Sequence, residues 1–249
     1  MNDLNLRFYV DFIERASPRR VLDFGCGDAT LVAALRDRGI DAFGADVFAH
    51  GLVSLPTART LVRSGFVRVI ENDDRLPFVN ASFDLIVSHM VFEHVADLQK
   101  VARELARVLA PDGMMYHQFA TRDQWREGHV GVPFAHRVPE TLREPYLRVM
   151  HRVGLGTHRE TSSSREWARR QALYLREHCF YRTRAEVRAL FEPAFEVREE
   201  ESDYVRYRAS GLARCALQYG GGDRVAELLF RRVGLIAFRM TPTAQPARA

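Results

Sequence analysis

The chain has 249 residues, of which 47% are hydrophobic and 27% charged, and its formal net charge at pH 7 is +4. These values are typical of a folded protein with a full-sized core, and they exclude a mainly disordered chain. No window reaches the roughly 18 apolar residues of a membrane span, and the first 20 residues carry three acids without an uninterrupted apolar stretch. We therefore expect a cytoplasmic protein with neither a signal peptide nor a membrane span.

Cysteine spacing and the distribution of arginine limit the other classes. Cys26, Cys179 and Cys215 are odd in number and far apart, which fits reduced thiols rather than disulfides or a zinc site. Arginines are concentrated between Arg122 and Arg188, where they suit an anionic substrate as well as a solvated basic face. No nucleic-acid-binding motif is present, so a nucleic-acid partner is not expected.

The first elements form a βαβ unit. Apolar spacing predicts an amphipathic helix over Asn5–Arg15, ended by Pro18. A buried strand follows in RRVLDFG, then a helix in DATLVAALRDRG and a second strand in IDAFGAD, which ends at Asp46. Two strands joined by a helix within so short a segment predict a parallel sheet with a right-handed crossover.

The alternation of helices and strands continues to residue 120 and returns after an interruption. The next predicted elements are a looser helix over 52–64, strands in GFVRVIE and SFDLIVSHMV, a helix in LQKVARELARVLA, a PDG turn and a fifth strand in MMYHQFA. The long segment that follows contains predicted helices over 140–153 and 165–178, which indicates a folded cover rather than a linker. A helix and strand in TRAEVRALFEPAFEVREEES, helices over 210–218 and 223–231, and a strand in VGLIAFRM come last.

The segment VLDFGCGDAT carries the first indication of a ligand. In a doubly wound sheet, ligands bind beyond the carboxyl ends of the strands, beside the first strand. A dinucleotide fingerprint requires a third glycine after Gly25 and Gly27, but Thr30 occupies that position. A pyrophosphate would also be repelled by Asp23, whereas a ligand ammonium would be attracted. The loop therefore indicates a zwitterionic ligand with an adenosine.

Four motifs in order resemble the class I S-adenosylmethionine-dependent methyltransferases: VLDFGCG, Asp46 at the end of the second strand, LPFVNASFDLIVSHMVFEHV and RVLAPDGMMYH. The resemblance covers about residues 20–120. It implies S-adenosyl-L-methionine as the cofactor, with Asp23 near the methionine ammonium. Gly25 and Gly27 would let the backbone approach the ligand, and Asp46 would accept hydrogen bonds from both ribose hydroxyls.

The resemblance also implies further cofactor contacts at the strand ends: Val47, Phe48, Asn72, Asp73, Ser88 and His89. The first two would pack on the adenine. The family usually has an aspartate four residues before LPF to meet the adenine amino group, and here that position is Asn72, with Asp73 as a second candidate. Ser88 and His89 would line the methionine end of the cofactor, although simple packing at the end of the strand is an equal alternative for both.

Histidines are the candidates for the transfer chemistry, because methylation of a hydroxyl benefits from a general base near neutrality. The candidate catalytic residues are His94, His117, His129 and His136. In EGHVGVPFAHR, we expect His129 or His136 to contact the acceptor and Arg137 to bind an anionic group such as a phosphate. This stretch more faintly resembles methyltransferases of bacterial glycan synthesis. A metal on His117, His129 and His136 is enforced by no spacing, so no metal site is expected.

The sequence thus predicts an α/β fold with a doubly wound, mostly parallel, Rossmann-like seven-stranded sheet and an inserted cover after the fifth strand. The expected single methyltransferase domain divides into an N-terminal helix (1–18), a cofactor-binding core (19–120), a substrate cover (121–182), final helices and strands (183–241) and a tail (242–249). We expect O-methylation of a small or glycan-linked acceptor. The alternatives are an RNA methyltransferase, favoured by the arginine-rich insert, and a catalytically silent S-adenosylmethionine-binding protein.

Overall fold

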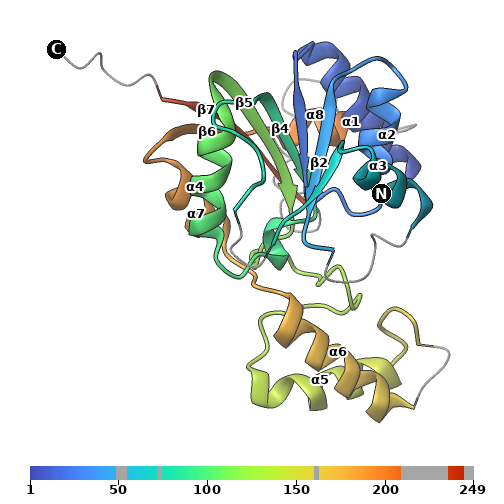
Figure 1. The fold of residues 1–249 in the computed structure, drawn as a ribbon. Helices are drawn as coiled ribbons and strands as arrows, with labels where there is room; N and C mark the ends of the chain where they lie inside the picture. Colours follow the sequence, from blue (N-terminus) through green and yellow to red (C-terminus); the bar gives the residue numbers. More distant parts are fainter. Residues whose placement is uncertain (49–54, 72–74, 160–162, 209–234, 244–249) are drawn as a thin grey trace.

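The computed structural model describes residues 1–48, 55–71, 75–159, 163–208 and 235–243. These residues form one seven-stranded sheet in the order β3-β2-β1-β4-β5-β7-β6 (Figure 1). Its strands are β1 Val21–Phe24, β2 Ala42–Asp46, β3 Val67–Val69, β4 Phe83–His89, β5 Leu109–Phe119, β6 Phe195–Glu199 and β7 Ile236–Pro242. The first five pair in parallel, while β7 is antiparallel to both β5 and β6. The predicted doubly wound, mostly parallel sheet is confirmed.

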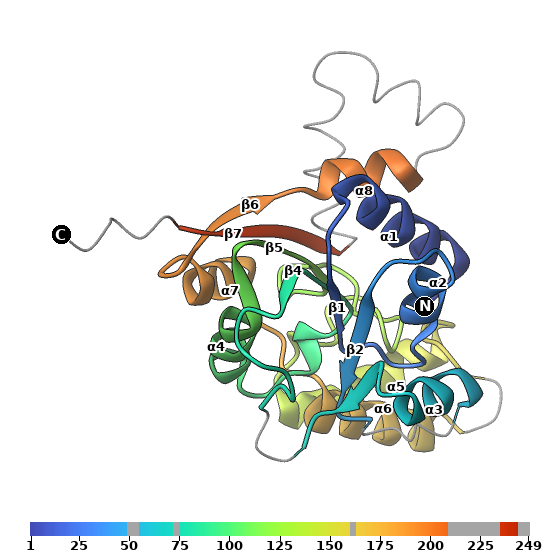
Figure 2. The ribbon, with the colours of Figure 1, turned by 45° about the horizontal axis from the view of Figure 1, so that its top comes forward.

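Helices cover both faces of this sheet (Figure 2). The helices of the described residues are α1 Asp3–Ala16, α2 Thr30–Arg36, α3 Pro56–Arg63, α4 Leu98–Val108, α5 Glu140–Arg152, α6 Ser164–His178, α7 Arg184–Phe191 and α8 Glu201–Arg208, and all but α5 and α6 lie on the faces of the sheet. One apolar cluster packs α1, α2 and α3 against the sheet, and another packs α4 and α7 against the opposite face. None of the helices in the described parts of the chain is both long and apolar enough to cross a membrane.

Two local expectations differ from the structure. The PDG segment is not a turn outside the sheet, because β5 already begins at Leu109 and takes up the extra residues as a shift in register against β4. Helix α8 was not predicted, because its sequence has few apolar residues. Its contacts come mainly from two tyrosines: Tyr204 and Tyr207 both pack edge-on against Phe8, and Tyr204 donates a hydrogen bond to Asn5. The helices expected over 210–218 and 223–231 lie outside the described residues.

The inserted cover has an apolar core of its own. Its helices α5 and α6 pack on each other beyond one end of the sheet (Figure 1), around a buried cluster that includes Leu147, Trp167 and Leu175. The indole of Trp167 is fully buried and donates a hydrogen bond to the Thr157 carbonyl at 2.8 Å. A Cβ at Gly156 would lie 2.4 Å from this ring, so the chain packs directly on the indole face.

Replacing this buried ring tests whether the cover is a separate packing unit. We expect Trp167→Ala to destabilise the cover by about 3–5 kcal/mol, because it leaves a cavity and an unpaired carbonyl. Hydrogen exchange should accelerate across residues 122–182 while β1 and β4 stay protected. The matched control is Trp125→Ala, since this second tryptophan is 48% exposed. Equal acceleration in the sheet would show that cover and sheet unfold together.

Candidate active site

A cavity of about 890 Å³ lies at the carboxyl ends of β1, β2 and β4, beneath the cover. Its wall combines α1, the loops after these strands and residues of the cover. The lining residues that matter for chemistry are Asn5, Asp23, Gly25, Gly27, Asp46, Val47, His89, Val91, His94, His129, Tyr174 and His178. The volume is near the upper end for small-molecule sites, so there is room for a cofactor and a second molecule.

The glycine loop is shaped by crowding from the loop that follows β4. Gly25 has a φ of +73°, and a Cβ there would lie 2.3 Å from Cγ2 of Val91. Any other residue would therefore be strained in its backbone and would also clash with this neighbour. The two glycines add no side chain to the cavity wall, which fits close approach of a ligand.

Asp46 is held in a fixed orientation at the end of β2. Its Oδ2 accepts a hydrogen bond from the Gly27 N–H at 2.9 Å, and its Oδ1 accepts one from the Phe48 N–H at 2.6 Å. Each carboxylate oxygen retains a second acceptor position, so the side chain can still receive two ribose hydroxyls. Val47 lines the cavity beside it, as expected of a residue that packs on an adenine. The side chain of Phe48 instead joins the apolar core with α2 and α3, which contradicts its expected adenine contact.

Asp23 is a buried acid at one end of the cavity. It is 3% exposed, and burial raises the pKa of its carboxyl to about 7, with further contributions from the charges of Asp46 and Asp28. The N-terminal ammonium of Met1, which lies 3.6 Å from Asp28 in the same wall, offsets the rise in the pKa of Asp23 only in part. A ligand ammonium beside Asp23 would restore the ionised form. The three acids at this end of the cavity thus favour a cationic ligand, which S-adenosylmethionine is.

The raised pKa of Asp23 predicts a pH-dependent affinity for S-adenosylhomocysteine, which keeps the ammonium of the cofactor. Below about pH 7 the free carboxyl holds a proton that the ammonium must displace, so binding should weaken about tenfold from pH 8 to pH 6. Calorimetry across this range measures the effect. Asp23→Asn should bind more weakly and lose this pH dependence, whereas Asp37→Asn, at an exposed acid outside the cavity, should keep it. A wild-type affinity that is constant across the range would contradict the assignment.

The residues at the end of β4 have separate environments. His89 lines the cavity and accepts a hydrogen bond from Asn5 Nδ2 at 2.9 Å, and burial lowers the pKa of the imidazole to about 4, so it is neutral. Ser88 does not line the cavity. Its hydroxyl lies 2.7 Å from Nδ1 of His117 in the interior of the sheet, so the structure supports the packing alternative for Ser88.

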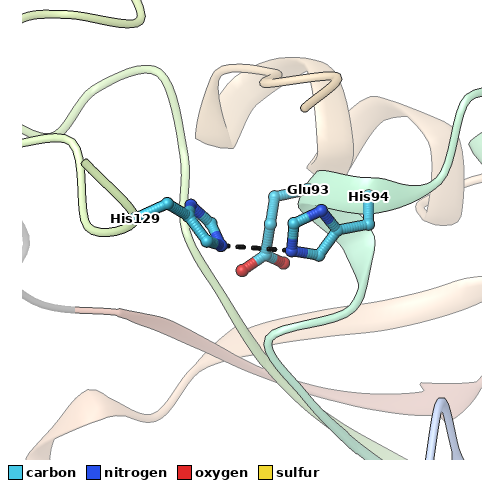
Figure 3. Close-up of side chains that lie close together, drawn as sticks. All are labelled: Glu93, His94 and His129. Atoms are coloured by element: carbon cyan, nitrogen blue, oxygen red, sulfur yellow. Dashed lines mark hydrogen bonds between the residues drawn. The ribbon is translucent and has the colours of Figure 1, made fainter. Parts of the chain in front are cut away.

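Two of the four candidate histidines meet at the cavity wall (Figure 3). Nε2 of His94, from the 3-10 turn η2 (Phe92–His94), lies 3.1 Å from Nε2 of His129 in the cover. The opposite nitrogens are fixed by hydrogen bonds: His94 donates from Nδ1 to the His178 carbonyl at 2.6 Å, and His129 donates from Nδ1 to Glu127 at 2.8 Å. The buried carboxyl of Glu93 lies beside them, and burial raises its pKa to about 7.

The remaining candidates for catalysis and acceptor binding lie outside the larger cavity. His117 is fully buried against the ring of Phe92, and burial lowers its pKa to about 3, so it faces the core and not the cavity. His136 lines a second cavity of about 330 Å³ with several arginines, and Arg137 points outward and donates to the Arg122 carbonyl at 2.7 Å. The loop reverses direction between residues 127 and 134, which separates His136 and Arg137 from His129. None of these three side chains lines the larger cavity.

The structure adds residues that the sequence reasoning missed. Asn5 enters the cavity from the first helix, while Tyr174 and His178 enter from α6 in the cover. No local motif marks them, because each is brought to the wall by packing between distant segments. Asn72 and Asp73, the expected adenine contacts, lie outside the described residues. Cys26, which lines the cavity, and Cys179 are free thiols.

Comparison with known proteins identifies the family. Residues 3–199 match the model of a family described as a methyltransferase domain. Since this range is more than half of the chain, the protein belongs to that family, and its sheet order and cavity are those of the class I S-adenosylmethionine-dependent methyltransferases. The resemblance to the class I methyltransferases is confirmed, and S-adenosyl-L-methionine is the cofactor that fits the crowded glycine loop, Asp46 and the buried acid Asp23.

Several curated proteins are similar over part of the chain. A demethylmenaquinone methyltransferase of Thermus thermophilus is 35% identical over 109 residues, which are 43% of this chain and 49% of that protein. A malonyl-[acyl-carrier protein] O-methyltransferase of Methylovorus is 34% identical over 120 residues, 45% of this chain and 40% of that protein. An uncharacterised methyltransferase of Mycobacterium bovis is 32% identical over 154 residues, 58% of this chain and 60% of that protein. The chain therefore spans about half the length of these relatives.

Among solved structures, an S-adenosylmethionine-dependent methyltransferase from Mesorhizobium loti superposes with a TM-score of 0.54 at 16% identity. The match covers 96% of this chain and 100% of the other. At this identity the likeness concerns the fold, and it agrees with the seven-stranded sheet described above.

Proposed function

We propose that this protein transfers the methyl group of S-adenosylmethionine to an oxygen atom of a small or glycan-linked acceptor. The acceptor oxygen would attack the methyl carbon as the carbon–sulfur bond breaks, and the bonding electrons would remain on sulfur. The hydroxyl proton would pass to an imidazole Nε2 of the His94–His129 pair as the new bond forms. The observation that carries the proposal is the pair His94 and His129 in the wall of the same cavity that holds Asp23 and Asp46.

The cavity is divided in a way that suits such a transfer. Carboxylates and backbone amides occupy the end where the cofactor ammonium and ribose would bind, and imidazoles occupy the side beneath the cover. In-line displacement needs the acceptor on the far side of the methyl group from sulfur. The names of two relatives also favour oxygen: the O-methyltransferase cited above and a ubiquinone biosynthesis O-methyltransferase of Sinorhizobium medicae, 33% identical over 100 residues.

Calorimetry with S-adenosylhomocysteine tests the cofactor end. We expect the wild type to bind and Asp46→Ala to bind at least tenfold more weakly, because the ribose loses its paired acceptor and two backbone N–H groups lose theirs. Asp37→Ala, an exposed acid outside the cavity, should bind like the wild type. No binding by the wild type, or equal binding by Asp46→Ala, would reject the cofactor site.

The acceptor atom can be identified with cofactor labelled by ¹³C in the methyl group and an extract of small metabolites. The chemical shift of the transferred carbon distinguishes oxygen from nitrogen, carbon and sulfur. We expect an oxygen-bound methyl, and a rate lower by about 10²-fold or more in His129→Asn, with affinity for S-adenosylhomocysteine unchanged. His158→Asn is the matched control, because His158 is exposed outside the cavity and its φ of +51° suits asparagine. A methyl found only on nitrogen, carbon or sulfur would refute the proposal.

A further inference from the structure

The side chains of Glu93, His94 and His129 converge at the junction between the sheet and the cover (Figure 3). One ligand atom from each, a carboxylate oxygen and two imidazole nitrogens, lies within 4.8 Å of the others. We propose that these three residues bind a divalent first-row transition-metal ion. Neither the family membership nor the names of the relatives assigns such a site.

The hydrogen bonds of the two rings leave their Nε2 atoms as acceptors that face each other. A carbonyl oxygen only accepts, so Nδ1 of His94 must carry the proton donated to His178. Glu127 already accepts a hydrogen bond from Tyr181, and it accepts a second from Nδ1 of His129. Two neutral imidazoles held in this way place their Nε2 lone pairs on atoms only 3.1 Å apart. That arrangement is repulsive until a positive charge lies between the nitrogens.

The distance between these nitrogens fits coordination of one metal ion. With metal–nitrogen bonds of about 2.05 Å, the 3.1 Å separation gives an angle of about 100° at the metal. This angle lies between the octahedral and tetrahedral values, so the separation of the two nitrogens suits one metal ion. The carbonyl of His178 and the carboxylate of Glu127 hold the rings by their far nitrogens, which is the usual support for metal-binding histidines.

Glu93 distinguishes a metal ion from a single shared proton. Its side chain is 1% exposed, and neither carboxylate oxygen has a hydrogen-bond partner among the described residues. A proton between the two rings would satisfy the nitrogens but would leave both oxygens unpaired in a buried site, at a cost of about 1–3 kcal/mol or more. A metal ion would be coordinated by all three side chains at once.

The donor set indicates which ion would bind. Two imidazoles and one carboxylate suit Zn²⁺, Co²⁺, Mn²⁺ or Fe²⁺, whereas Mg²⁺ and Ca²⁺ prefer oxygen ligands alone. Because His94 and His129 also line the large cavity, the remaining coordination positions face the acceptor. This role rests on the proposed function: with both Nε2 atoms bound to the metal, a coordinated hydroxyl would release its proton to water instead of to an imidazole, and it would be held behind the methyl group.

Titration of the metal-free full chain with Co²⁺ tests the site, because coordinated cobalt has visible absorption bands that report its ligands. We expect one equivalent to bind, Zn²⁺ to displace it, and Mg²⁺ at the same concentration to have no effect. Glu93→Gln and His129→Asn should each weaken Co²⁺ binding at least tenfold, while His158→Asn should bind like the wild type. A thermal melt of each variant should show that it is folded, and Zn²⁺ should raise the melting temperature of the wild type more than that of the two site variants.

The same samples separate this proposal from the proposed function. Calorimetry with S-adenosylhomocysteine in metal-free protein measures the cofactor site alone. Cofactor binding without Co²⁺ uptake would overturn the metal site and leave the methyltransferase proposal intact, because the two histidines would then hold only a proton. Co²⁺ uptake without cofactor binding would support the metal site and overturn the methyltransferase proposal. Equal Co²⁺ binding in the wild type, Glu93→Gln and His129→Asn would place the metal elsewhere and would also overturn the proposal.

Discussion

The pairing of β1 with β4 in the middle of the sheet is the constraint on which the site depends. Val21 lies opposite Leu85 and Asp23 opposite Val87, so both strands end at the same edge. The chain leaves β1 toward β2 and leaves β4 toward β5, on opposite sides, which opens a crevice between the two following loops. The close approach of Gly25 and Val91 is the floor of that crevice. A side chain at position 25 would push the loops apart and move the residues on both.

The charges around the crevice complement a positively charged cofactor. Burial and acidic neighbours raise the pKa of Asp23, and the N-terminal ammonium of Met1 in the same wall offsets this only in part. The protein therefore stores unfavourable electrostatic energy in the free site, and a ligand with an ammonium relieves it. This explains why an acid precedes the glycine loop in a position where a pyrophosphate-binding loop has none.

The sequence predicted the sheet, and the expected cofactor residues of the glycine loop and Asp46 do line one cavity, because both depend on local patterns. Buried strands, the glycine loop and Asp46 at the end of a strand each follow from residues that are close together in the chain. The acceptor side depends instead on how the cover packs. His94 and His129 are separated by 35 positions, yet they meet, whereas His136 lies close to His129 in the chain and enters a different cavity. Spacing alone does not distinguish these cases.

The cover joins the sheet mainly through polar contacts, since its apolar residues are used in its own core. The N–H of Phe180 donates to the Glu93 carbonyl, and the guanidinium of Arg182 donates to the carbonyls of Val95 and Ala96. The contact between His94 and His129 belongs to the same junction, directly above the acceptor space. A metal ion bound between these rings would strengthen the attachment of the cover to the sheet. The same ion would form part of the cavity wall on the side proposed for the acceptor. Activation of the acceptor and closure of the cavity would then depend on the same three side chains.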